Sequence, residues 1–242
     1  MRYINRISAI FFLTLTVSFV NAQTLTPKLV FKDHPQTHNM HIASDGQYLY
    51  TCNGGKSELG QISKFTLDGI KIGSYKFEID MRSVMYNPAD KKLYVYTYGQ
   101  KLYKIMDLVQ GIYSEVFHFS ERSEQTAPAI SPNGKLIYFM EYGEVYVYTL
   151  KNKKLKATLS GLNTTDNAAE GGTAIAVDKK YLYSWNASQQ TAYIYDLKGK
   201  YQKSVKLNQG DYGFSLSYAN GLLWVSTDGN YEEGTWYGYV VE

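Results

Sequence analysis

Cysteine is nearly absent from this chain of 242 residues, because Cys52 is the only one. No disulfide can therefore form within the chain, and the fold must be stabilised by its core. A chain of this length can bury roughly 70% of the surface that its unfolded state exposes, which is enough for such a core.

An excess of charge of either sign is also lacking. The sequence has 25 lysine and arginine residues against 22 aspartate and glutamate residues. Two of the arginines, Arg2 and Arg6, lie in a leader that we expect to be removed, which leaves a net charge of +1. Nucleic-acid and anionic-membrane binding call for a basic excess or patch, so neither partner is expected.

After residue 22, no apolar run reaches the 18 residues that a membrane helix needs, so membrane insertion is not expected. The first 22 residues instead have the features of a secretory signal peptide. Arg2 and Arg6 precede the apolar stretch "ISAIFFLTLTVSFV" as a positive n-region, and "VNA" before Gln23 suits cleavage. No cysteine stands at the cut to carry a lipid. We predict a periplasmic or secreted protein in which residues 23–242 form a single domain.

Helical periodicity and the motifs of common enzymes are missing as well. The sequence contains no nucleophile elbow, no HExxH and no CxxC. The run "GGKS" at residues 54–57 lacks the first glycine of a phosphate-binding loop, and no helix is predicted after it. No motif therefore indicates a particular reaction.

Tyrosine, by contrast, is abundant, with 24 of 242 residues. This residue favours half-buried strands, so the composition predicts an all-β protein.

The sequence repeats five times with a period of about 44 residues. The aromatic residue that closes each motif recurs in steps of 44, 44, 45 and 41 residues. Turn sequences such as "SDG" and "SPNG" separate the apolar runs, which predicts four antiparallel strands per repeat, called A to D from the inside outwards. We interpret the closing aromatics as packing residues: Tyr50, Tyr94, Tyr138, Tyr183 and Trp224.

Four antiparallel strands repeating every 40 to 45 residues are typical of a β-propeller. The run "SPNGKLIYF" resembles the blades of YVTN/NHL-type and WD40-like propellers. The resemblance covers the mature chain and implies a five-bladed propeller, without implying an activity. The WD dipeptide and its GH partner are missing, as are the motifs expected of propeller-type glutaminyl cyclases.

The N-terminal segment "TPKLVFKDH", residues 26–34, resembles the outermost strand of a repeat, yet no inner strands precede it. The last repeat stops after its third strand. Phe31, Phe77 and Phe119 stand 46 and 42 residues apart, in register with the repeat. We predict that this segment supplies the fourth strand of blade five and closes the ring, which hides edges that invite aggregation.

Polar residues recur where the chain enters each inner strand. The D-to-A links and B-to-C hairpins of a propeller share one face, around the mouth of the channel, and the long irregular loops of this chain belong to these two classes. Counting back from the first turn of each repeat places a carboxylate at nearly the same position in four blades and His38 in the fifth. The predicted ligand-binding residues are His38, Asp80, Arg82, Glu124, Glu170, Asp211 and Tyr212.

Carboxylates gathered in this way repel one another, so either their pKa values rise or a cation binds. Hard oxygen ligands suit Ca²⁺ or Mg²⁺, and a Ca²⁺ site is one interpretation. The other is that these loops are merely polar and solvated. The predicted calcium ligands are Asp80, Glu124, Glu170 and Asp211.

Three of the four histidines, His34, His38 and His41, lie within eight residues. Their spacing matches no compact helical zinc motif. We expect His34 at the end of the closing strand, His38 at the channel mouth and His41 inside the first inner strand. The three need not converge, and no tight Zn²⁺ or Cu²⁺ site is predicted.

Two other features are secondary candidates. Trp185 lies at a predicted B-to-C loop, where it is a candidate for stacking on a sugar, and Trp236 is not assigned. Asn163 and Asn186 are glycosylation acceptors only in a eukaryotic source.

The small size and the missing motifs favour an exported, non-catalytic module that binds a glycan, peptide or protein through the loops at the channel mouth. One alternative is a small hydrolase or lyase that uses carboxylates or His38 there, with or without a divalent cation. The other is a structural subunit of an envelope complex. The fold does not decide among them, since one fold hosts many functions.

Overall fold

The computed structural model describes residues 23–162 and 174–241, and the predicted signal peptide and Glu170 lie outside these ranges. In the described part, 21 strands are accompanied by a single 3-10 helix, Ser57–Leu59. No helix in these ranges is long and apolar enough to cross a membrane. The all-β prediction is confirmed.

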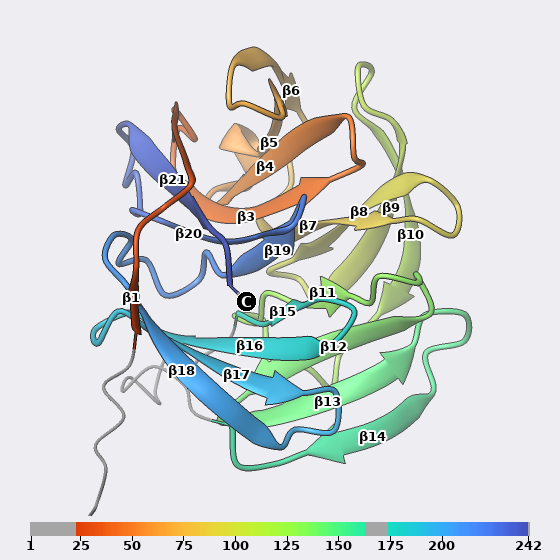
Figure 1. The fold of residues 1–242 in the computed structure, drawn as a ribbon. Helices are drawn as coiled ribbons and strands as arrows, with labels where there is room; N and C mark the ends of the chain where they lie inside the picture. Colours follow the sequence, from red (N-terminus) through yellow and green to blue (C-terminus); the bar gives the residue numbers. More distant parts are fainter. Residues whose placement is uncertain (1–22, 163–173, 242) are drawn as a thin grey trace, which may run out of the picture.

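The strands form five four-stranded blades around a central axis (Figure 1), as the repeat predicted. Blade 1 contains β3 (His38–Ser44), β4 (Tyr48–Gly54), β5 (Gln61–Thr66) and β6 (Lys71–Lys76). Blade 2 contains β7 (Met81–Asn87), β8 (Lys92–Thr97), β9 (Lys101–Asp107) and β10 (Ile112–His118). Blade 3 contains β11 (Ala129–Ile130), β12 (Leu136–Glu141), β13 (Glu144–Thr149) and β14 (Leu155–Leu159). Blade 4 contains β15 (Ala176–Val177), β16 (Tyr181–Asn186), β17 (Thr191–Asp196) and β18 (Tyr201–Leu207).

Blade 5 closes the ring with a strand from the other end of the chain. Its first three strands are β19 (Ser217–Ala219), β20 (Leu222–Ser226) and β21 (Gly234–Tyr239), and its fourth is β2 (Leu29–Asp33). β2 pairs antiparallel with β21, so that Phe31 stands opposite Trp236. The predicted one-plus-three closure is confirmed.

The residues before β2 add a feature that the repeat did not predict. β1 (Gln23–Leu25) lies parallel to β18 as a fifth strand on the outer edge of blade 4, with Leu25 opposite Leu207. The N-terminal segment therefore spans the seam between blades 4 and 5.

The recurring tyrosines have a second role besides packing, because their hydroxyl groups bind the turn between strands A and B. Tyr50, Tyr94 and Tyr183 donate to Asp45, Asp90 and Asp178 at 2.8, 2.8 and 2.9 Å. Asp45 and Asp178 also accept two backbone N–H groups each. A buried tyrosine needs a partner for its hydroxyl, and the turn carboxylate supplies it. Burial raises the pKa of all three tyrosines.

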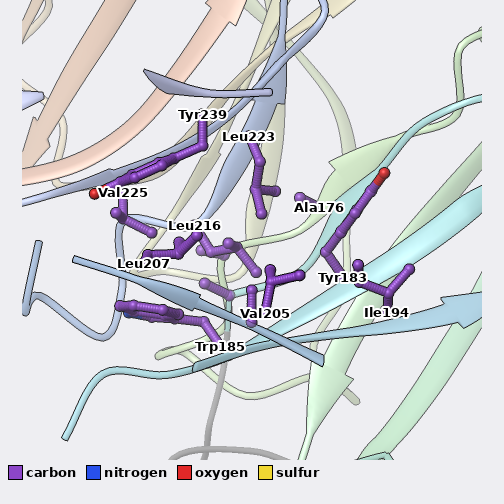
Figure 2. Close-up of a cluster of buried hydrophobic side chains, with 13 residues drawn as sticks. Ala176, Tyr183, Trp185, Ile194, Val205, Leu207, Leu216, Leu223, Val225 and Tyr239 are labelled. Atoms are coloured by element: carbon purple, nitrogen blue, oxygen red, sulfur yellow. The ribbon is translucent and has the colours of Figure 1, made fainter. Parts of the chain in front are cut away.

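The core lies between neighbouring blades, where the sheets face one another. Between blades 4 and 5, Tyr183, Trp185 and Leu223 belong to one cluster of buried side chains (Figure 2). Trp185 is therefore a core residue, and its predicted role in stacking on a sugar is wrong. β16 runs on to Asn186, so this tryptophan lies in a strand and not in a loop. Trp236 is fully buried as well.

Because the strands of a blade are antiparallel, the five A-to-B turns lie at one end of the channel. The B-to-C hairpins and the D-to-A links lie at the other end, which we call the loop face. The inner strands β3, β7, β11, β15 and β19 surround the axis between the two ends (Figure 1).

Candidate functional site

The pairing of strands A and B gives the structural register of the predicted site. Each inner strand has one residue opposite the closing aromatic: Ala43 opposite Tyr50, Met85 opposite Tyr94, Ala129 opposite Tyr138, Ala176 opposite Tyr183 and Ser217 opposite Trp224. Five places before them stand His38, Asp80, Glu124 and Tyr212, and in blade 4 Gly171, which lies outside the described residues. Tyr212, and not Asp211, is thus the structural equivalent of His38. The A-to-B hairpins differ in length, which shifts a count made from the turns.

His38 lies at the start of β3 and is held by residues of blade 5. Its Nδ1 donates to Oδ1 of Asp228 at 2.7 Å, a contact between residues 190 positions apart. Tyr212 stacks on the imidazole with 6.0 Å between ring centroids, and Tyr231 meets it edge-on at 5.7 Å. The His38 side chain is 28% exposed, so the loop face presents an oriented imidazole between two aromatic rings.

Tyr231 is held in this place by an unusual backbone. Asn230 and Tyr231 both have positive φ angles, 36° and 70°. The Tyr231 N–H donates to the carbonyl of Thr37 at 3.0 Å, while its side chain remains 49% exposed. Non-glycine residues in this region cost free energy and cluster at binding and active sites. The Nζ atom of Lys56 lies 5.1 Å from the centroid of the same ring.

Asp80 and Arg82 form an ion pair beside this cluster. Nη1 of Arg82 donates to Oδ1 of Asp80 at 2.8 Å, and the same oxygen accepts the N–H of Gly55 at 2.8 Å. The guanidinium also lies over the ring of Tyr98, 4.8 Å from its centroid. The Arg82 side chain is only 8% exposed, and its Nε has no partner among the described residues. One buried donor is thus left unsatisfied.

The side chains of His38 and Arg82 lie against the two glycines of "GGKS". A Cβ at Gly55 would lie 2.8 Å from Cδ2 of His38, and a Cβ at Gly54 would lie 2.8 Å from Nη1 of Arg82. At Gly54 the carbonyl oxygen of Met81 would be nearer still, so a larger residue there would displace backbone as well as a side chain. Gly55 also has a φ angle of 112°, which few other residues adopt.

The remaining predicted site residues are less closely joined. Glu124 is exposed, and its hydrogen bond with the Tyr98 hydroxyl raises the pKa of that tyrosine. Glu124 thereby connects to Arg82 through the ring of Tyr98. Asp211 is exposed, and its N–H donates to the carbonyl of Ser226 at 3.2 Å.

The three histidines have different partners, as expected from their separate places. His34 follows β2 and pairs with Glu233 at 3.2 Å on the outer surface. His41 lies inside β3, is 4% exposed and donates from Nδ1 to the carbonyl of Val84 at 2.8 Å. Within residues 23–162 and 174–241, no group of three or more His, Cys, Asp or Glu side chains is arranged to hold a metal ion.

The calcium interpretation stays a prediction, because Glu170 lies outside the described residues. If the carboxylates bind Ca²⁺, the ion is expected to raise the melting temperature, and Asp80→Asn combined with Glu170→Gln is expected to remove that increase. Thermal unfolding with Ca²⁺, Mg²⁺ and chelator measures this. A melting temperature that responds to none of the three would contradict the interpretation.

Asn186 is an unsuitable glycosylation acceptor in the folded chain. It is 2% exposed, and its Oδ1 accepts from Ser188 and from the N–H of Gln189 at 2.9 Å each. Asn163 lies outside the described residues.

The known proteins that this chain resembles are similar to it in fold alone. No protein-family model and no curated protein matches the sequence. The chain is a β-propeller. Glutaminyl cyclase from Myxococcus xanthus is similar with a TM-score of 0.63 at 8% identity, over 92% of this chain and 100% of that one. A protein of unknown function from Bacteroides thetaiotaomicron gives 0.54 at 6% identity, over 84% and 70% of the two chains. Virginiamycin B lyase from Staphylococcus aureus gives 0.46 at 16% identity, over 81% and 66%.

At identities of 8% and 6%, these similarities support the propeller fold and no activity. Sequence reasoning found His38, Asp80, Arg82 and Tyr212 in this site, but missed Asp228 and Tyr231. Both lie in the B-to-C hairpin of blade 5, residues 227–233, which, like that of blade 1, residues 55–60, is longer than the hairpins of the other blades. The only signal of their role was that irregularity.

Proposed function

We propose that this propeller is an exported binding module that recognises a glycan, or a peptide with an exposed ring, through the loop face. The observation that carries the proposal is the exposed Tyr231, held in a strained conformation against His38. An exposed aromatic ring next to fixed polar groups is a typical ligand platform. The signal peptide, as a sequence prediction, would deliver the protein to the compartment where such ligands occur.

The polar groups around Tyr231 suit a ligand rich in hydroxyl or carbonyl groups. With Nδ1 of His38 engaged by Asp228, its Nε2 is the atom that remains for a ligand. Beside it, the carboxylate of Asp80 is 17% exposed and is an acceptor, whereas Nε of Arg82 is buried. A ring stacked on Tyr231 would place its substituents within reach of these groups. Aromatic residues supported in this way usually dominate the free energy of binding.

Substitution of Tyr231 is the direct test. On an array of glycans and short peptides, the unmodified protein is expected to bind a subset, and Tyr231→Ala is expected to weaken that binding at least about tenfold, since aromatic anchors contribute about 1.4 kcal/mol or more. Tyr201→Ala is the matched control, because Tyr201 is 50% exposed but lies on the outer strand β18. Equal loss in both variants, or no bound ligand at all, would contradict the proposal.

The His38–Asp228 pair favours one second candidate, a hydrolase or lyase. A histidine whose Nδ1 is fixed by a carboxylate is a common general base. An enzyme of this kind would convert the ligands that it binds, and His38→Gln would abolish conversion while leaving part of the binding. Mass analysis of array ligands after incubation separates the two candidates. Unchanged ligands would support the binding module.

A further inference from the structure

The end of the channel opposite the loop face holds a cavity of about 870 Å³. The inner strands of all five blades and their A-to-B turns line it, and so does Val241 near the C-terminus. Figure 1 shows this end of the chain at the centre of the ring. Cavities of this size commonly hold small molecules. It shares no residue with the loop-face site.

His41 lines this cavity and offers an unsatisfied acceptor. A carbonyl can only accept, so the proton shared with Val84 belongs to Nδ1 of His41. Burial lowers the pKa of His41 to about 4, so the imidazole is neutral at pH 7 and Nε2 carries a lone pair. Nε2 is buried and has no hydrogen-bond partner among the described residues. A buried acceptor without a donor costs free energy that a ligand donor would recover.

The rest of the cavity is apolar along its walls and carries two aspartates and two lysines at its mouth. Val84, Ala129 and Val177 lie along the walls. The mouth carboxylates, Asp45 and Asp178, are each engaged by two backbone N–H groups and a tyrosine hydroxyl.

Two lysines at the mouth of the cavity carry positive charges. Lys179 and Lys180 also line the cavity, are exposed, and form no ion pair within the described part of the chain. Because the neighbouring carboxylates are already engaged by other donors, the two ammonium groups remain for an anion.

We propose that this cavity binds a small organic anion with an apolar body and a hydroxyl or N–H group at its far end. The anion would face Lys179 and Lys180, the body would contact the apolar walls, and the donor would reach Nε2 of His41 after a small shift of that buried ring. His41 and the turn residue Asp45 are four residues apart along β3, so His41 lies roughly 13 Å below the level of the A-to-B turns. Lys179 and Lys180 belong to such a turn, and their side chains cover part of that distance. A ligand of the length of 4-hydroxycinnamate fits this arrangement.

The test is a calorimetric titration of the mature chain with three probes. 4-Hydroxycinnamate is expected to bind. Cinnamate, which lacks the donor, is expected to bind about fivefold more weakly, as for one hydrogen bond. Tyramine, which has the hydroxyl group but a positive charge, is expected not to bind. Because these probes differ while the protein does not, a folding defect cannot explain the result.

Substitutions then locate the site. Lys179→Ala with Lys180→Ala is expected to weaken 4-hydroxycinnamate binding about fivefold, since each exposed charge contributes little. Lys151→Ala, an exposed lysine on a C-to-D turn, is the matched control and is expected to leave the affinity unchanged. Tyr231→Ala is expected to have no effect, which separates this cavity from the loop-face site. Equal affinity for all three probes, no binding at 10 mM, or no effect of the double substitution would overturn the proposal.

Discussion

A chain that starts at residue 34 is expected to be insoluble, or to melt far below a chain that starts at Gln23. The deletion removes β1 and β2 and leaves β21 with an open edge. It also removes Phe31, whose ring lies 4.7 Å from that of Phe65 and 5.6 Å from that of Trp224. Loss of a buried phenylalanine alone costs about 3–5 kcal/mol, a large share of the stability of a typical domain.

Asp33 adds to this loss because it connects blade 5 to blade 1. Its carboxylate is 2% exposed and accepts from the Thr51 hydroxyl at 2.5 Å and from Lys71 at 3.3 Å. Without the closing strand, Thr51 loses this buried partner.

A chain that starts at residue 29 is the control for the deletion. It lacks β1 but keeps β2, so the ring stays closed, and we expect only a modest decrease in the melting temperature. Thermal unfolding followed by circular dichroism compares the three chains. A chain without β2 that melts within a degree or two of the full one would contradict the closure.

Trp185→Ala is expected to lower the free energy of unfolding by about 3–5 kcal/mol, the usual cost of removing a buried tryptophan. The indole is 2% exposed and packs in the cluster between blades 4 and 5 (Figure 2). Chemical denaturation measures the loss. Trp185→Phe should recover part of it, because the smaller ring fills part of the same space.

A comparison of Trp185→Ala with Tyr231→Ala tests whether Trp185 stabilises the core or binds a ligand. Tyr231→Ala is expected to change stability by less than about 1 kcal/mol, because half of that side chain is exposed. Trp185→Ala should therefore affect unfolding, and Tyr231→Ala should affect binding. A stable Trp185→Ala protein that fails to bind would reverse the assignment.

The repeat alone was enough to predict the propeller, its five blades and its closure. Those features follow from spacing, and residues such as Tyr50, Tyr94 and Phe31 keep that spacing because each fills an equivalent position in a blade. β1 was not predictable, since three residues carry no period. The site was predicted in part, because equivalent offsets bring His38, Asp80 and Tyr212 to equivalent positions.

What the repeat could not predict lies in the contacts between blades and in loops of irregular length. Asp228 of blade 5 contacts His38 of blade 1, from a hairpin whose sequence no other blade repeats. Trp185 was misplaced because β16 extends further than the alignment of the repeats implied. Counting from the turns aligned Asp211 with His38, whereas the strand pairing aligns Tyr212 with it. The cause is similar, since the A-to-B hairpins do not have equal lengths.

The pairing of β2 with β21 also fixes an order of events during synthesis. Phe31 stands opposite Trp236, so the two partners are 205 residues apart in the chain. At about 5–20 residues per second, the first strand leaves the ribosome about 10–40 s before the strand that it must join. During that interval β2 is an apolar segment without its partner. A factor that holds the nascent chain extended would therefore protect this segment more than any other part of the propeller.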